Sequence, residues 1–393
     1  MSLPLLALFL TAFAFGTAEF VIAGILPEVA DGLGITVPVA GYLISGYALG
    51  IAVGGPILAL LSKKMSRKTL ILLLGGVFIL GHALCAIAPT FELLMLARLV
   101  VAVVHGTYFG IAAIVAVGLV PPERRGFAVA LILSGLTVSN ILGVPLGTAI
   151  GTWLGWRATF WAVGVVGLLA TVIIGFWLPA NAGNDANKGS MLTEFKALGR
   201  QQVVTSLLIA VLSMIGQYSL FTYIAPLLRD VTGLDVGLIP WILLLYGVGA
   251  TIGVFIGGRL ADWSIRPAML LLLCLQVAGF TAVYFAAPHP AIMAVTVILW
   301  GGVNFAVGSP LQSRILSWAA DAPNLASTLI PTGFNIGIAV GAYLGASMLE
   351  NGYGYGDLPL VGSVCMVISA LIAVASFVWE DRVGDRPPTP IAA

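Results

Sequence analysis

Twelve long apolar runs, separated by short breaks, constrain this chain more than any other feature. Each run is long enough for a helix of about 20 residues, the length that crosses the hydrocarbon core of a bilayer. Clusters of Gly, Pro and charged residues mark the breaks between runs. We therefore predict an all-α membrane protein with twelve transmembrane helices. The expected spans are 4–26, 38–61, 69–88, 92–119, 125–150, 157–179, 201–226, 238–261, 267–287, 290–313, 324–350 and 358–379.

Composition supports a membrane protein and excludes several other classes. Hydrophobic residues make up 60% of the chain and charged residues only 8%, whereas a soluble domain carries about 25% charged residues. A net charge of +1 argues against a nucleic-acid partner. The first run follows Met-Ser-Leu-Pro without a basic segment, so we expect a retained helix and not a cleaved signal peptide.

The chain divides into two similar halves. The longest break, 180–200, is polar, and it separates bundles of six spans at 1–179 and 201–393. An offset of 198–199 residues aligns the halves and places Tyr47 opposite Tyr246. Such a parallel repeat indicates a substrate site between the halves near the midplane of the membrane.

Positive charge predicts the orientation in the membrane. If both termini are cytoplasmic, the outer loops carry only Arg157 and Arg229, and Arg98 lies inside a span. The other fourteen of the 17 Lys and Arg residues are then cytoplasmic, as the positive-inside rule requires. We expect both termini in the cytoplasm and 180–200 to be a cytoplasmic linker.

Glu19, in Thr17-Ala-Glu-Phe, lies well inside a span, whereas the other fifteen acidic residues lie in loops, at probable helix ends or in the tails. An ionised acid at the centre of a membrane helix costs roughly 2.5–3.5 kcal/mol on insertion scales, so such a group is functional by default. We predict that Glu19 couples proton binding to transport. The alternative is a structural carboxyl that a neighbouring helix or water satisfies.

Two further residues are candidates for the same proton-coupling site. Arg98 and Glu19 each lie roughly 9 to 10 Å from the outer ends of their spans, at 1.5 Å per residue. An ion pair or a shared water network between them is one expectation, and an Arg98 that snorkels to the outer interface is the other. His105 follows Arg98 on a similar helical face, where it either relays protons or is a hydrogen-bonded packing residue.

Amides and phenols within the spans are candidates for lining a substrate cavity. Without strong charge, they suit a neutral or amphipathic ligand, although membrane aromatics often face lipid or pack against other helices. The candidates are Asn140, Gln217, Asn304, Gln312, Asn335, Tyr47, Tyr218, Tyr223 and Tyr246.

The fifth span and the basic loops carry patterns for conformational change. Gly135, Gly143 and Gly147 form a small-residue groove that lets another helix approach closely, and Pro145 loosens the backbone between them. Small residues at this spacing are also ordinary in helix packing. The loop after the second span ends on Arg67 and Lys68, which are candidates for a role in conformational change. The alternative is that these basic residues serve only as an orientation signal.

These motifs resemble the major facilitator superfamily, and within it the twelve-helix drug:proton antiporter family of bacterial efflux permeases. The family's loop motif is kept in the second half as Gly258-Arg-Leu-Ala-Asp262 with Arg266. The first half departs from it, because Lys63 stands at the position of the family's Asp. In the family such an Asp and Arg latch two helices, and the Gly143-Val-Pro145 segment resembles a motif of exporters.

The resemblance implies a proton-driven exporter of a small neutral or amphipathic, drug-like compound that works by alternating access. It also implies a monomer in a bacterial inner membrane. Export of purine nucleosides or sugars and uncoupled facilitation stay open as alternatives. We expect no cofactor besides the proton gradient and no enzyme activity, because His82, His105 and His289 are scattered and no nucleotide-binding loop is visible. The dispersed Cys85, Cys274 and Cys365 predict neither disulfides nor a metal site.

Overall fold

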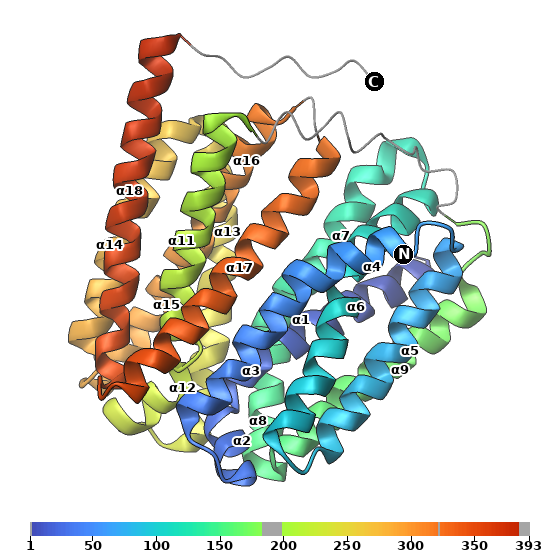
Figure 1. The fold of residues 1–393 in the computed structure, drawn as a ribbon, viewed down its shortest axis with the longest axis horizontal. Coiled ribbons are helices and arrows are strands. Elements are labelled where there is room, and N and C mark those ends of the chain that lie inside the picture. The colour runs from blue at the N-terminus through green and yellow to red at the C-terminus, as the bar shows by residue number, and fades with distance from the viewer. Residues whose placement is uncertain (1, 183–198, 321–322, 385–393) are drawn as a thin grey trace. The chain divides into compact units, whose positions relative to one another are not determined.

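The computed structural model describes residues 2–182, 199–320 and 323–384 (Figure 1). Within these ranges, 12 helical segments are long and apolar enough to cross a membrane, and no residue belongs to a β-strand. The predicted all-α fold with twelve spans is confirmed. Most of the expected linker, 180–200, lies outside the described residues.

The described residues form two compact units. One comprises 2–182 with 235–244, and the other comprises 199–234 with 245–384. The equal division agrees with two bundles of six spans, although residues 235–244, which the sequence places in the second bundle, group with the first unit. The domain boundaries 1–179 and 201–393 stay a prediction.

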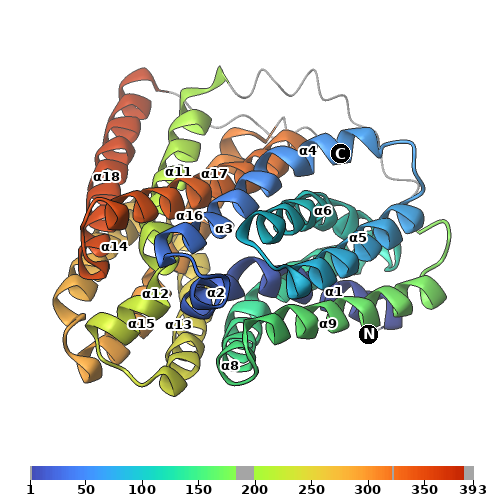
Figure 2. The same ribbon diagram turned by 60° about the horizontal axis from the view of Figure 1, so that its bottom comes forward.

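In the first unit, α1 packs against α7, α8 and α9, and α5 packs against α6 and α9. Figure 2 shows α5 and α9 running side by side. The α-helices are α1 (Leu3–Gly24), α2 (Leu26–Leu33), α3 (Val37–Leu49), α4 (Gly55–Leu61), α5 (Arg67–Ile87), α6 (Phe91–Gly118), α7 (Arg125–Val138), α8 (Val144–Leu154) and α9 (Trp156–Trp177). Thr36, Ser66 and Thr90 cap α3, α5 and α6 by accepting a hydrogen bond from a backbone N–H of the first turn.

The second unit repeats this packing. Helix α11 packs against α17 and α18, and α14 packs against α15 and α18. These pairs correspond to α1 with α7, α8 and α9, and to α5 with α6 and α9, as the offset between the halves leads one to expect. The α-helices are α11 (Gln201–Phe221), α12 (Ile224–Pro226), α13 (Ile239–Trp263), α14 (Ile265–Ala286), α15 (Pro290–Ala306), α16 (Gly308–Trp318), α17 (Pro323–Glu350) and α18 (Leu358–Val383).

Two spans of the first unit contain a widened turn next to a proline. The π-helical turns Gly50–Gly54 and Ser139–Gly143 lie directly before the helices that contain Pro56 and Pro145. Proline lacks an N–H and clashes with the carbonyl four residues earlier, and a π-helical turn absorbs both defects without ending the span. Pro145 therefore marks the local loosening that the sequence predicts.

The glycines of the fifth span face α1. A Cβ on Gly135 would lie 2.7 Å from Ala12 Cβ, and a Cβ on Gly147 would lie 2.5 Å from Val21 Cγ2. On Gly143 it would overlap the hydroxyl of Thr17. The groove predicted from these glycines thus receives the helix that carries Glu19.

Candidate functional site

Glu19 lies on α1 with its side chain 10% exposed, and its Oε2 atom is 3.7 Å from Nε2 of His105 on α6. The other ring nitrogen, His105 Nδ1, lies 3.0 Å from the hydroxyl of Tyr47 on α3. When the hydroxyl donates to Nδ1, the proton of a neutral imidazole is on Nε2 and faces the carboxylate. Three helices therefore meet in a chain of three titratable groups, which we call the Glu19 cluster (Glu19, His105, Tyr47).

Arg98 of α6 is 1% exposed, so it does not snorkel to the interface. Its Nε donates to the Leu43 carbonyl at 3.3 Å, and one terminal nitrogen donates to the Ala18 carbonyl, also at 3.3 Å. The guanidinium lies over the Tyr47 ring, 4.4 Å from its centroid. Arg98 therefore lies at the depth of Glu19, next to its backbone.

Of the two arrangements expected for Arg98 and Glu19, the direct ion pair is not formed, and the shared water network stays a prediction. Among the ion pairs of the described residues, Glu19 is joined to His105. The other terminal nitrogen of Arg98 has no hydrogen-bond partner. Carbonyl dipoles and a π face therefore hold the guanidinium in place, and an ionised Glu19 would interact with it only through space.

Aromatic rings surround the Glu19 cluster, and sequence reasoning did not single them out. Phe15 and Phe109 lie 5.0 and 5.3 Å from the His105 ring, between centroids. Phe15 also packs against Phe78 at 4.3 Å and against Tyr108 at 4.8 Å. These rings lower the local polarity around the carboxylate, which strengthens every electrostatic contact there.

Tyr47 and Tyr223, two of the candidates for lining a substrate cavity, each have a hydrogen-bond partner within their own unit. Tyr47 belongs to the Glu19 cluster through His105. The hydroxyl of Tyr223 donates to the Ala342 carbonyl at 3.1 Å, and its ring lies against Gly345 on α17. A phenol in a membrane helix must satisfy its hydroxyl, and Tyr223 does so by joining two helices of the second unit.

Four of the other candidates, in the second unit, have buried side chains with identified partners. The Gln217 amide donates to the Tyr246 hydroxyl at 3.1 Å. Asn304 accepts a hydrogen bond of 3.2 Å from Gln276, a residue that sequence reasoning missed. Tyr218 is buried and packs edge-on against Phe221, with ring centroids 5.8 Å apart.

The remaining amide candidates interact locally. Asn140 donates to the Leu136 carbonyl at 3.1 Å, and Asn335 donates to the Pro331 carbonyl at 3.0 Å, each within its own span. The Asn335 carbonyl oxygen is buried without a partner. Gln312 is exposed on α16.

The expected latch between Asp262 and Arg266 is not present. Arg266 instead binds α18, with hydrogen bonds of 2.6 Å to Asp381 and 3.0 Å to Glu380, and Asp262 is exposed. Gly258 has open space where a Cβ would lie. The helix following the loop thus turns Arg266 toward the last span and away from Asp262.

Glu380 is a second buried acid, and the sequence placed it just beyond the end of the last span. Helix α18 runs to Val383, four residues beyond the predicted end at 379, and Glu380 is 3% exposed on it. Glu380 pairs with the buried Arg314 of α16, which also donates to Ser376 at 2.7 Å. In the first unit, Lys68 donates to the Leu178 carbonyl at the end of α9 at 2.6 Å, and Arg67 is partly buried beside it.

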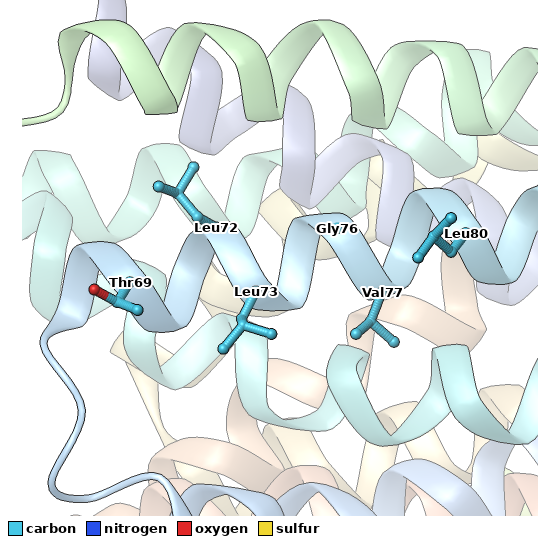
Figure 3. Close-up of a pocket in the computed structure, with 6 residues that line it drawn as sticks. All are labelled: Thr69, Leu72, Leu73, Gly76, Val77 and Leu80. Carbon is cyan, nitrogen blue, oxygen red and sulfur yellow. The ribbon is translucent and has the colours of Figure 1, made fainter.

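A shallow apolar hollow lies along one side of α5 (Figure 3). One helix supplies all of its lining, which is Thr69, Leu72, Leu73, Gly76, Val77 and Leu80. A hollow with a single polar side chain offers little to orient a ligand. It is therefore a poorer candidate than the Glu19 cluster or the buried amides Gln217 and Asn304.

Comparisons with known proteins identify the family. The family model of the Major Facilitator Superfamily matches residues 8–341. The inner membrane transport protein YdhP of Escherichia coli K12 is 37% identical over 373 residues, which are 95% of each chain. A chloramphenicol resistance protein of Streptomyces lividans is 36% identical over 382 residues, which are 96% of each chain. The putative transporter AraJ of E. coli K12 is 32% identical over an alignment of 401 positions that covers 98% of each chain.

A solved structure shares the fold. A bacterial homolog of the human lysosomal transporter Spinster, crystallised inward-facing and unoccupied, matches with a TM-score of 0.77 at 18% identity and covers 99% of this chain and 98% of its own. With twelve apolar spans and inner-membrane relatives, the chain is a multi-pass inner-membrane protein, and its relatives are transporters and not enzymes. The chain is a member of the Major Facilitator Superfamily.

Proposed function

We propose that this transporter is a proton-coupled exporter that exchanges protons for a small neutral or amphipathic compound by alternating access. The observation that carries the proposal is the Glu19 cluster, in which a carboxylate within a membrane span lies 3.7 Å from His105. A chloramphenicol resistance protein among the relatives supports efflux of a drug-like compound. The transporter works as a monomer with both termini in the cytoplasm.

The cluster supports coupling because its members can exchange a proton while their burial depends on charge. An ionised Glu19 is stabilised by Arg98, whose guanidinium donates to the neighbouring Ala18 carbonyl. A proton that arrives from outside neutralises Glu19 and eases its passage through an occluded state. Substrate that loads from the cytoplasm favours the ionised form, so proton and substrate compete and are exchanged.

Transport of chloramphenicol into inside-out vesicles tests this proposal. We expect an imposed proton gradient, acidic inside, to drive accumulation by the wild type, and Glu19→Gln to abolish the gradient-driven part while the protein still folds. Glu92→Gln is a matched control, because Glu92 is an exposed carboxylate in the first turn of α6 in the same unit.

Two results would contradict the proposal. Equal gradient-driven accumulation by Glu19→Gln would remove this residue from coupling. Wild-type transport that is indifferent to the gradient would identify an uncoupled facilitator. The same assay is repeated with inosine and with arabinose in place of chloramphenicol. Gradient-driven accumulation of one of these compounds instead of chloramphenicol would identify a purine nucleoside or a sugar as the substrate.

A further inference from the structure

The second unit contains an uncharged counterpart of the Glu19 cluster. The offset of 198–199 residues aligns Gln217 with Glu19, because 217 minus 19 is 198. It also aligns Tyr246 with Tyr47 and Asn304 with His105, each 199 residues apart. The repeat therefore keeps the phenol and replaces both proton-exchanging partners with amides.

These residues belong to one buried group from four helices of the second unit. Tyr246 of α13 accepts the Gln217 hydrogen bond and stacks on Phe221 of α11, with ring centroids 4.9 Å apart. Trp300 of α15 lies 5.2 Å from Tyr246, between centroids, and is one helical turn from Asn304. We call this group the amide–aromatic cluster; its members are Gln217, Phe221, Tyr246, Gln276, Trp300 and Asn304, each at most 3% exposed.

Three polar atoms of this cluster are buried without a hydrogen-bond partner. They are Gln276 Oε1, Asn304 Nδ2 and Trp300 Nε1. Leaving such an atom unpaired costs about 1–3 kcal/mol, so native proteins seldom keep several together for stability alone. If both amides were flipped, the pair would still present one free acceptor and one free donor.

We propose that the amide–aromatic cluster binds an uncharged planar group of the substrate that carries both a hydrogen-bond donor and an acceptor, as a carboxamide or lactam does. The free donors and acceptor of Gln276, Asn304 and Trp300 match such a group. The rings of Tyr246, Phe221 and Trp300 supply flat apolar surfaces for it. This assignment rests on the proposed export of a neutral or amphipathic compound and adds Gln276 and Trp300 to its recognition.

The absence of charge in the cluster argues against an ionic ligand group. All six side chains are uncharged, and an ion brought among them would lose its hydration without gaining a counter-charge. In the first unit, the aligned positions hold an acid and an imidazole. We infer that the two copies of the repeat diverged into a proton site and a site for a neutral ligand group.

Three ring compounds of similar size and different charge test the proposal. Benzamide carries the neutral donor–acceptor group, benzoate is an anion and benzylamine is a cation at neutral pH. We expect benzamide to raise the unfolding temperature of the purified full-length protein, and the two ions to leave it unchanged. In the double variant Gln276→Leu/Asn304→Leu we expect the apparent affinity for benzamide to fall at least about tenfold.

The double variant also distinguishes a ligand site from a structural network. Replacing both partners of a buried polar pair with apolar groups is close to neutral for stability, so we expect its unfolding temperature without benzamide to stay close to that of the wild type. Ser219→Ala is the control, because it removes a buried hydroxyl on α11 that donates to the Gly216 carbonyl of its own helix. It should keep the benzamide response.

No benzamide response in the wild type, an equal response in the double variant, or equal binding of benzoate or benzylamine would each overturn the assignment. These measurements use no proton gradient. Their failure is therefore distinguishable from failure of the coupling proposal, which is read from gradient-driven transport.

Discussion

The contacts of single residues show how the protein holds a guanidinium and a carboxyl group inside a membrane without pairing them directly. Arg98 uses its planar fork to bind two backbone carbonyls on neighbouring spans and lies over the Tyr47 ring. Glu19 is left to contact His105. A tight pair would trap both charges, whereas this arrangement lets Glu19 change its protonation state without a guanidinium having to leave.

We expect Tyr47→Phe to weaken proton coupling and to destabilise the protein by about 1–3 kcal/mol, because the buried Nδ1 of His105 loses its partner. The substitution removes the hydroxyl that orients His105 and keeps the ring below Arg98. The loss of one hydrogen bond, about 1 kcal/mol, corresponds to roughly a fivefold loss of gradient-driven transport. Tyr108→Phe removes a buried hydroxyl that donates to the Leu8 carbonyl, outside the cluster. If both variants lost transport equally, Tyr47 would have no special link to His105.

At the scale of helices, α1 is positioned by contacts that only small residues allow. Gly135, Gly143 and Gly147 bring α7 and α8 against the face of α1 that holds Ala12, Thr17 and Val21. In lipid the hydrophobic effect does not drive helices together, so their association depends on van der Waals contacts, which a close approach of the backbones increases. Because Glu19 lies on α1, the contact of α1 with α7 and α8 also helps to position its carboxyl group.

Two glycines of α7 offer a matched test of the contact between α1 and α7. A Cβ at Gly135 would lie 3.0 Å from the Phe9 carbonyl oxygen and 2.7 Å from Ala12 Cβ, so we expect Gly135→Ala to destabilise the protein by about 1–3 kcal/mol. Gly126, on the same helix, has nothing within 4 Å of such an atom. Gly126→Ala should be neutral or stabilise by up to about 1 kcal/mol. Thermal unfolding in detergent measures both, and equal effects would contradict a tight α1–α7 contact.

For the molecule as a whole, the sequence was sufficient to predict the class of fold. It was not sufficient to predict which side chains contact one another. Span length and hydropathy are local properties, so twelve helices could be predicted without knowing how they pack. Rotation of each helix about its axis is set by contacts between distant segments. That is why Arg266 was expected beside Asp262 and lies against α18, and why Gln276 was missed.

The location of Glu19 could be predicted, because an acid in an apolar run stands out in any sequence. Its nearest partner could not be chosen, because Arg98 and His105 lie on the same helix and one helical face can present either of them. The buried pair of Glu380 and Arg314 was missed for a related reason: both residues lie at the ends of apolar runs, where a shift of four residues moves a charge from the interface into the bundle.

The orientation of the whole chain is the last expectation, and it follows from charge alone. With both termini cytoplasmic, the outer loops hold only Arg157 and Arg229, and each cytoplasmic Lys or Arg opposes translocation of its loop. We expect a green fluorescent protein fused after Ala393 to fluoresce in a bacterial host, since this reporter folds in the cytoplasm and fails after export through the general secretory route. Alkaline phosphatase fused at the same position should be inactive.

A fusion after Gly155, in the outer loop between α8 and α9, should give the opposite pair of results. Reversed activities at the two positions would invert the topology and place the linker outside, which would also reverse the direction in which a proton gradient reaches Glu19.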